Sequence, residues 1–249
     1  MRLSVRQAAR AYPTIRQEEL RIILLEAMPR LMPEMDEKLA GFALERLRAA
    51  GVEVRLNTRV SGATAEEVCI KDKDGAPIPA RTLVWTSGVA PHPFVAESPL
   101  PRDGRGWVTV DAHLRVPGFP GVWALGDCAR VPDVLHPGHT HPAMAQHAIR
   151  EASRLAHNVV ASVRGARTRP FRYRTMGYMA TLGHFDGIGL IGPLRVSGFP
   201  AWALWRTYYL WRLPRLEKRL RVAMDWTLDL LFGRYISVIQ TVTASDRDR

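Results

Sequence analysis

The residues best suited to chemistry in this chain are Gly126 and Asp127, which end a short apolar run. The run, Val122–Leu125, is typical of a buried strand, and the small residues after it can open a helix. A glycine allows a ligand to approach the backbone closely because it has no Cβ atom. A carboxylate at the end of such a strand lies where open α/β sheets bind ligands, so we expect it to accept hydrogen bonds from hydroxyl groups. An N-cap aspartate at an ordinary strand-to-helix turn would give the same pattern.

A second pair of candidate residues, Ala145 and Gln146, stands near the start of an expected helix from His141 to Val160. Apolar residues recur there at the spacing of one helix face: Ala148, Leu155, Ala156 and Val159. Gln146 and Arg150 are four residues apart, so they share a face. The helix therefore presents an amide and a permanent cation side by side.

Gly126-Asp127 followed by Ala145-Gln146, in this order and at this spacing, resembles the type II NADH dehydrogenases, which are single-chain FAD-dependent NADH:quinone oxidoreductases. The segment Gly106–Pro117 resembles the same family, and the resemblance runs in collinear order over nearly the whole chain. It implies that Asp127 holds the ribityl chain of FAD beside Gly126. It also implies that Ala145 and Gln146 lie against the isoalloxazine and that Gln146 borders the quinone pocket.

The family usually carries a second glutamine where this chain has Arg150. An arginine is a permanent cation that only donates hydrogen bonds. We therefore expect Arg150 to bind a quinone carbonyl and to stabilise developing negative charge. A pair with Glu151, or with a lipid headgroup at the pocket mouth, is the alternative.

The glycine-rich turns of a complete enzyme of this family do not occur in the sequence. Such a turn, G-x-G-x-x-G between a strand and a helix, places a pyrophosphate on the helix N-terminus, and the family needs two. The six residues Gly187-Ile188-Gly189-Leu190-Ile191-Gly192 have this glycine spacing, but they lie late in the chain and outside a strand-to-helix context, which is more typical of a glycine-bearing hairpin. The sequence therefore resembles the carboxyl-terminal part of the family, beginning after the second turn.

The first third of the sequence resembles part of an NAD-binding unit. Ile22–Leu25 is expected to be a buried strand, and Glu26, which follows it, would hydrogen-bond the adenosine ribose hydroxyls and repel a 2′-phosphate. This favours NADH over NADPH, although a surface acid at a strand end is the alternative. Residues 33–50 are expected to form a helix and residues 52–56 a strand.

Two further strand predictions complete this part of the chain. Residues 68–70 and 82–85 are expected to flank a hairpin turn at Lys73-Asp74-Gly75. Val84–Val89 is expected to return to the sheet. By resemblance, Gly88 in this segment lies near the nicotinamide and the flavin.

Four histidines lead into the Gln146 helix: His136, His139, His141 and His147. Imidazoles at this spacing could bind zinc or nickel, but no acidic or cysteine ligand is expected to join them. We therefore expect a solvated histidine-rich loop and no metal site. The position near the flavin also suits His141 or His147 for handling quinone protons.

The end of the chain, residues 199–231, is amphipathic at helical spacing, with a second helix expected from Pro214. Trp202, Trp205 and Tyr209 share one face, and basic residues are dense around it: Arg206, Arg212, Arg215, Lys218, Arg219 and Arg221. An aromatic belt beside a basic face is typical of helices that lie in a bilayer interface. A core-packing helix hairpin or a dimer interface would use the same stripe.

The composition agrees with a globular protein that meets an anionic surface. The 249 residues are 47% hydrophobic, and 35 basic against 24 acidic residues give a net charge of +11. This charge suits nucleic acid or anionic lipid, but no nucleic-acid motif or zinc-finger spacing occurs, so no nucleic acid is expected. Cys69 and Cys128 form no C-x-x-C and indicate a reducing compartment without a redox dithiol. The sequence shows neither a signal peptide nor an apolar window long enough to span a bilayer.

The expected fold is α/β, a partial two-dinucleotide-binding-domain (Rossmann-like) flavoprotein with carboxyl-terminal amphipathic helices. We expect residues 1–89 to form part of an NAD-binding domain, residues 90–198 the carboxyl part of an FAD-binding domain, and residues 199–249 a membrane-associating tail. The expected reaction passes electrons from NADH through FAD to a membrane quinone without proton pumping, with no catalytic nucleophile or metal.

Two other functions fit parts of the pattern. One is a truncated, non-catalytic membrane-binding fragment, and the other is a flavoprotein similar to sulfide:quinone reductases, which need a thiol pair at the flavin. The expected location is the cytoplasmic face of the cell membrane, as a peripheral (monotopic) protein. The carboxyl-terminal helices could also pair two copies as a homodimer.

Overall fold

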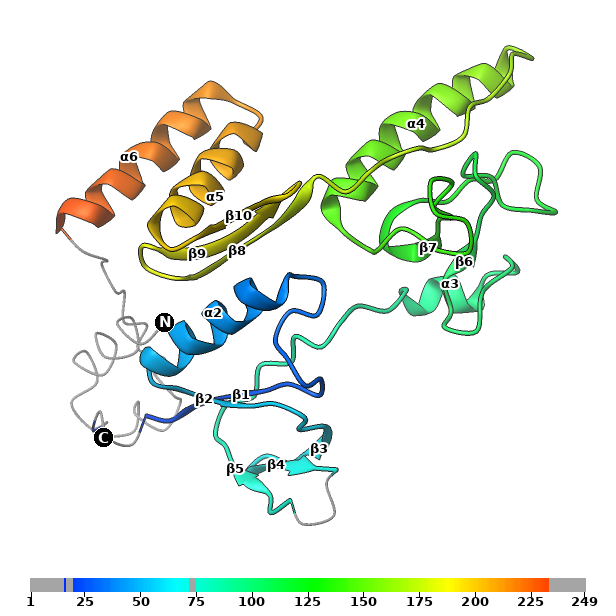
Figure 1. The fold of residues 1–249 in the computed structure, drawn as a ribbon. Helices are drawn as coiled ribbons and strands as arrows, with labels where there is room; N and C mark the ends of the chain where they lie inside the picture. Colours follow the sequence, from blue (N-terminus) through cyan, green and yellow to red (C-terminus); the bar gives the residue numbers. More distant parts are fainter. Residues whose placement is uncertain (1–15, 17–19, 72–74, 233–249) are drawn as a thin grey trace, which may run out of the picture. The chain divides into compact units, whose positions relative to one another are not determined.

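The computed structural model describes residue 16 and residues 20–71 and 75–232. The chain divides into two compact units, the first from residues 1–83 and 177–249 and the second from residues 84–176 (Figure 1). Both units contain helices and strands, which confirms the α/β class. The functional division into 1–89, 90–198 and 199–249 stays a prediction, although residues 177–198 group by contact with the first unit.

The first unit contains a βαβ motif. Strand β1 (Ile22–Leu25) pairs in parallel with β2 (Val52–Arg55), and helix α2 (Glu37–Ala49) joins them. The helix begins four residues later than expected because Asp36 caps it, accepting a hydrogen bond from the Lys38 N–H over 3.1 Å. The apolar faces of the helix and strands form most of this unit's core: Leu31, Met35, Leu39, Ala43, Val52, Val54 and Ile188.

An antiparallel sheet follows, formed by β3 (Val60–Ala63), β4 (Glu67–Ile70) and β5 (Ile78–Pro79). The prediction that residues 82–85 form the hairpin partner of β4 is wrong. The shorter segment β5 pairs with β4 instead, and residues 82–85 form no strand. The expected turn residues 73 and 74 lie outside the described residues.

The expected strand Val84–Val89 is also wrong. Val84 and Trp85 are 74% and 61% exposed, and the segment has no strand conformation. The N–H of Gly88 donates instead to the carbonyl oxygen of Thr86 over 3.0 Å, in a tight turn that the positive φ of 79° at Gly88 permits. A strand needs a hydrogen-bonded neighbour, and no described strand pairs with this segment.

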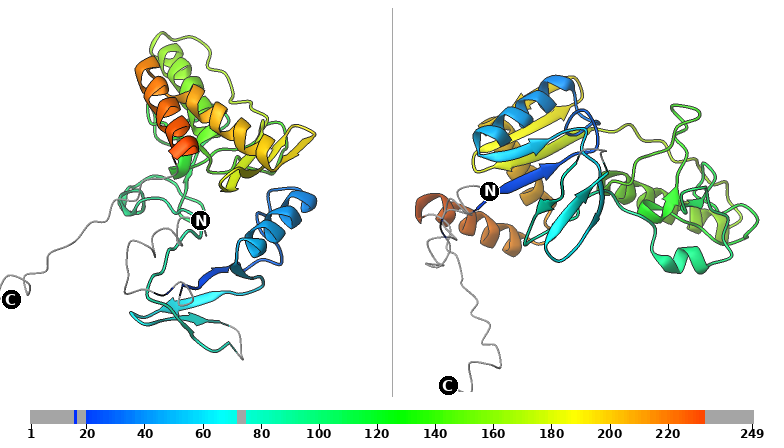
Figure 2. Two further views of the ribbon diagram at one scale, coloured as in Figure 1. Left: turned by 90° about the vertical axis from the view of Figure 1, so that its left-hand side faces the viewer. Right: turned by 90° about the horizontal axis from the view of Figure 1, so that it is seen from below.

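A second antiparallel sheet completes the first unit, with β8 (Gly177–Gly183), β9 (Asp186–Ile191) and β10 (Leu194–Ser197) in the order β10-β9-β8. Helix α5 (Phe199–Arg212) packs on this sheet, and α6 (Leu216–Phe232) follows it (Figure 2). This unit therefore carries both predicted carboxyl-terminal helices.

The glycines between residues 187 and 192 lie in a hairpin, as the sequence predicts. Gly187 and Gly189 are inside β9, and Gly192 turns the chain toward β10 with a φ of 56°. A Cβ atom on Gly187 would lie 3.0 Å from the backbone nitrogen of Trp202. Glycine is required there because helix α5 approaches the strand so closely.

The second unit has a small parallel pair, β6 (Val108–Thr109) with β7 (Ala129–Arg130), and two helices, α3 (Pro93–Glu97) and α4 (Ala145–Val163). A 3₁₀ turn over Gly126–Cys128 leads into β7. Apolar residues from the loops and strands form its core: Val108, Val110, Leu114, Val116, Ala129, Val131 and Phe171.

The expected buried strand Val122–Leu125 is wrong. Only Trp123 forms a bridge, with Arg115, and the N–H of Ala124 donates to the carbonyl oxygen of Leu114 over 3.2 Å. These bonds tie the segment to a neighbouring loop and leave it half-buried. The Gly126 turn therefore follows an irregular segment and not a sheet strand.

Helix α4 occupies nearly the predicted residues but buries polar side chains. Those buried in it are His147, Glu151 and Asn158. Apolar side chains of the same helix are exposed, namely Ile149 (48%), Val160 (49%) and Val163 (83%). The helix thus turns a polar face toward the core of the second unit, where each buried polar group needs a partner.

Candidate functional site

The Gly126–Asp127 turn is held against the start of helix α4. Gly126 has a φ of 69°, which favours glycine, and its N–H donates to the Glu151 carboxylate over 2.8 Å. The carbonyl oxygen of Asp127 accepts a hydrogen bond from the Trp107 indole over 3.0 Å. The Asp127 residue itself is exposed. The turn is therefore fixed by its backbone and leaves its carboxylate available to a ligand.

Glu151, expected from the sequence only as a partner for Arg150, is a residue of the site. It is 2% exposed. Burial and, less strongly, the charge of Asp127 raise the pKa of the Glu151 carboxyl, although the hydrogen bond from Gly126 opposes them. The sequence signal that could have identified Glu151 is its spacing: it stands four residues after His147 and so lies on the same helix face.

Gln146 meets an aromatic residue from the segment that follows α4. The Tyr173 hydroxyl donates to Oε1 of Gln146 over 2.9 Å. The guanidinium carbon of Arg150 lies 4.5 Å from the centroid of the same tyrosine ring. Gln146 and Arg150 thus share a helix face as predicted, and Tyr173 contacts both.

Arg150 does not pair with Glu151, which was one alternative. Its Nη1 donates to the carbonyl oxygen of Gln146 over 2.8 Å, and its Nη2 lies 3.1 Å from Sδ of Met176. Glu151 instead bonds Gly126. The arginine is therefore steered toward the start of α4.

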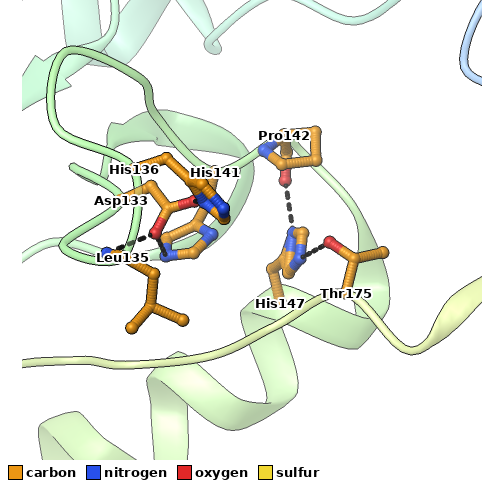
Figure 3. Close-up of polar contacts among 7 residues, drawn as sticks. All are labelled: Asp133, Leu135, His136, His141, Pro142, His147 and Thr175. Carbon is orange, nitrogen blue, oxygen red and sulfur yellow. Dashed lines mark hydrogen bonds and ion pairs between the residues drawn. The ribbon is translucent and has the colours of Figure 1, made fainter. Parts of the chain in front are cut away.

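The histidine-rich loop gathers around Asp133, an acidic residue that was not expected to join the four histidines. Nδ1 of His136 lies 2.7 Å from Oδ2 of Asp133, and the Leu135 N–H donates to Oδ1 of the same carboxylate over 2.9 Å (Figure 3). Burial alone would raise the pKa of Asp133, but these hydrogen bonds hold it below its usual range. Nε2 of His141, which is buried, lies 4.0 Å from Oδ1 of Asp133.

His147 is enclosed and not solvated, contrary to the expectation of a solvated loop. It is 1% exposed, with Nδ1 3.1 Å from the Pro142 carbonyl oxygen and Nε2 3.1 Å from Oγ1 of Thr175 (Figure 3). Burial, followed by the charges of His141 and Arg150, lowers the pKa of His147 to about 4. Its imidazole is therefore neutral at physiological pH.

His141 is buried beside His147, with the two ring centroids 5.0 Å apart. Burial lowers the pKa of His141, as does the charge of His136, while Asp133 opposes them. Within residues 16, 20–71 and 75–232, no three His, Cys, Asp or Glu side chains gather in a metal-binding arrangement.

The two expected NAD-side residues lie in different units. Glu26 directly follows β1, where its carboxylate accepts a hydrogen bond from the Met28 N–H over 2.9 Å. Gly88 lies in the second unit, in the turn described above. The roles predicted for both residues stay predictions.

The aromatic stripe of α5 is divided between core and surface. Trp202 is only 7% exposed and packs on Phe185 and Phe199, so it is a core residue and not part of an exposed belt. The guanidinium carbon of Arg206 lies 4.4 Å from the ring centroids of both Trp202 and Trp226, which links α5 to α6. Several large apolar side chains of the two helices remain exposed: Trp211, Leu216, Leu220, Met224, Leu231 and Phe232.

None of the described helices is both long and apolar enough to cross a membrane.

The sequence and the fold match known proteins. A probable NADH dehydrogenase of Dictyostelium discoideum is 34% identical over 231 residues, which are 92% of this chain and 50% of that protein. The type II NADH:quinone oxidoreductase Ndh of Mycobacterium tuberculosis is 33% identical over 233 residues, which are 90% and 49% of the two proteins. These relatives confirm the resemblance to type II NADH dehydrogenases, and the chain spans about half of their length.

The solved structure of NDH2 from Plasmodium falciparum in complex with NADH has a similar fold, with a TM-score of 0.81 and 17% sequence identity. The similarity covers 93% of this chain and 62% of that one. A family model described as pyridine nucleotide-disulphide oxidoreductase matches residues 7–152, more than half of the sequence. The chain therefore belongs to the pyridine nucleotide-disulphide oxidoreductase family.

Proposed function

We propose that this chain forms the carboxyl-terminal part of an FAD-dependent enzyme that passes electrons from NADH to a quinone without pumping protons. The observation that carries the proposal is the tie between the Gly126–Asp127 turn and helix α4, made by the 2.8 Å hydrogen bond from Gly126 to Glu151. Ala145 and Gln146 begin the same helix. The type II NADH:quinone oxidoreductase among its relatives supports the same reaction.

The residues at the turn suit a flavin dinucleotide. Gly126 has no side chain to block a ligand, and the exposed carboxylate of Asp127 can accept hydrogen bonds from ribityl hydroxyls. When bound, FAD supplies the chemistry that accepts a hydride from NADH and passes two electrons to a quinone. Asp127 would bind the ribityl chain, and Ala145 and Gln146 would border the ring.

NADH is the proposed electron donor, with Glu26 at the end of β1 as the residue that recognises the adenosine ribose. A carboxylate accepts hydrogen bonds from ribose hydroxyls and repels a 2′-phosphate. Gly88 would approach the nicotinamide.

The quinone is proposed to bind near Gln146 and Arg150, which both contact Tyr173. An amide N–H and a guanidinium are donors, and quinone carbonyls are acceptors. Positive charge from Arg150 would also stabilise the negative charge that develops on the quinone oxygens.

Helices α5 and α6 are proposed to attach the protein peripherally to the cytoplasmic face of the cell membrane. The exposed apolar side chains of α6 and the basic residues Arg215, Lys218 and Arg221 support this, because such helices bind in the interface of anionic bilayers. Pairing of two copies through these helices is the alternative use of the same surface.

The function is tested by co-expressing the chain with a polypeptide that carries two glycine-rich βαβ turns, hereafter the completed enzyme. We expect the completed enzyme to reduce a soluble quinone analogue with NADH, and the chain alone to show no such activity. A purified, folded completed enzyme that oxidises no NADH with any quinone would instead support a non-catalytic membrane-binding role.

A further inference from the structure

Quinone reduction consumes a proton that NADH does not supply. A hydride carries two electrons and one proton, whereas a quinone needs two electrons and two protons to become a quinol. Each turnover, NADH + H⁺ + quinone → NAD⁺ + quinol, therefore takes one proton from water. If the proposed function holds, a site shielded from solvent needs titratable groups that lead to it.

A line of titratable side chains in the second unit begins at the surface. His136 is exposed, and its Nδ1 lies 2.7 Å from Oδ2 of Asp133. The other oxygen of Asp133 lies 4.0 Å from Nε2 of His141 (Figure 3). That nitrogen is buried and has no hydrogen-bond partner, which is rare in folded proteins. The carboxylate thus stands between an exposed and a buried imidazole.

A small cavity continues the line from His141 toward the Gly126 turn. Its volume is about 10 Å³, and His141, His147, Glu151 and Gly126 are among the residues that line it. This is about the volume that a single water needs, and the side chains of His141, His147 and Glu151 give the lining its polar groups. One water in the cavity would connect the His141 imidazole with the Glu151 carboxyl.

His147 lines the cavity but does not carry protons. The Pro142 carbonyl oxygen only accepts, so Nδ1 of His147 must hold the ring proton and donate it, and Nε2 then accepts from Thr175. The lowered pKa of about 4 agrees with this neutral form, which burial and the charges of His141 and Arg150 maintain while Asp133 opposes them. His147 therefore lines the cavity as a neutral side chain and passes no proton along it.

We propose that His136, Asp133, His141 and Glu151 form a proton path from the surface to the Gly126 turn, and that Glu151 releases the proton toward the start of helix α4. Glu151 is shielded from solvent and held at the turn by the Gly126 N–H. Burial and the Asp127 charge favour its protonated form, while the Gly126 hydrogen bond favours the ionised form. A carboxyl balanced in this way can both hold a proton and release it.

The Gly126 amide proton reports on Glu151 because it donates to that carboxyl. In the full 249-residue chain, labelling glycine nitrogen and leucine carbonyl carbon selects only two Leu-Gly pairs, Leu125-Gly126 and Leu182-Gly183. The second pair lies on β8 and is an internal reference. In NMR spectra of the wild type, we expect the Gly126 signal to move with pH as one averaged peak. Glu151→Gln should abolish this movement while keeping an acceptor for the N–H.

The path itself is tested by the rate of proton exchange at Glu151, measured by relaxation dispersion of the Gly126 signal. His141→Phe should slow this exchange by at least about tenfold, since it removes a positioned proton carrier. Asp133→Asn, which keeps the acceptor for the Leu135 N–H, should slow it as well. His157→Phe is the matched control and should leave the rate unchanged, because His157 is an exposed histidine on helix α4, which also carries Glu151.

Equal exchange rates in the wild type, His141→Phe and Asp133→Asn would overturn the path. So would a Gly126 signal that stays fixed throughout a pH titration of the folded chain, because Glu151 would then not titrate beside it. These measurements need neither cofactor nor quinone. Failure of the proposed function would appear separately, as absent NADH:quinone activity in the completed enzyme.

Discussion

The Tyr173 hydroxyl donates to the amide oxygen of Gln146 over 2.9 Å, and this bond sets the direction of the amide. With the oxygen placed by Tyr173, Nε2 is the donor side of the amide, and it donates to Sδ of Met144 over 3.9 Å. The Arg150 guanidinium, another donor, stands over the same tyrosine ring. One aromatic side chain therefore positions two donors at the start of helix α4, which suits a ligand that only accepts hydrogen bonds.

Arg150→Gln tests whether this pair faces the quinone. A hydrogen bond from a charged group contributes about 1.5–3 kcal/mol, so we expect quinone-driven reoxidation of the completed enzyme to slow about tenfold or more. Stopped-flow reduction by NADH should stay unchanged, as should both half-reactions in Arg154→Gln, one turn along the helix. Altered reduction with normal reoxidation would place Arg150 on the nicotinamide side.

The completed enzyme should prefer NADH to NADPH because Glu26 would face the 2′-phosphate with like charge. Glu26→Gln keeps an acceptor for the Met28 N–H and removes the charge. We expect kcat/KM for NADPH to rise about tenfold, which corresponds to roughly 1.4 kcal/mol. Glu34→Gln, an exposed acid in the same unit, is the control. A wild-type enzyme that turns over faster with NADPH would refute the assignment.

The neutral, buried His147 makes stability depend on pH. Its pKa is about 4 in the folded protein against 6.5 for the unperturbed side chain, so between these values the unfolded chain binds more protons. The contribution of His147 to the free energy of unfolding should be fully present above about pH 6.5. It should be lost as the pH drops toward 4, which lowers stability by up to about 3 kcal/mol.

Urea unfolding between these pH values checks this expectation. His147→Gln should flatten the fall, whereas His157→Gln, which replaces an exposed histidine on the same helix, should not. A fall of equal size in the wild type and His147→Gln would show that another group is responsible.

The exposed apolar side chains of α6 should bind anionic vesicles. Leu220 and Met224 are 61% and 62% exposed, and burying such a side chain contributes about 1.5–3 kcal/mol. Replacing both by glutamine should weaken vesicle binding by tenfold or more, and added salt should weaken it further. The control is Ile149→Gln with Val163→Gln on α4. Equal losses from both double variants in vesicle sedimentation would count against attachment through α6.

Features set by local sequence could be predicted well. Helix α4 forms nearly where its periodicity places it. The β9 glycines lie in a hairpin, as predicted from their place outside a strand-to-helix context. The shared face of Gln146 and Arg150 also follows from helix geometry alone.

Features that depend on distant contacts could not be predicted. Residues 122–125 resemble a strand, but the chain around Leu114 takes up their hydrogen bonds. Trp202 belongs to a helical stripe in the sequence, yet β9 and Phe185 bury it. Glu151 gains its interest only because folding places its carboxyl against the Gly126 N–H, 25 residues away in sequence.

Flavin content tests the central claim most directly. The purified completed enzyme should show the absorbance of bound FAD, and Asp127→Ala should lower the flavin retained per protein by about tenfold, since a lost charged hydrogen bond costs about 1.5–3 kcal/mol. Asp225→Ala, which removes an exposed acid from α6, should retain the wild-type amount. A folded completed enzyme without flavin, or equal flavin in Asp127→Ala and the wild type, would contradict the proposed site.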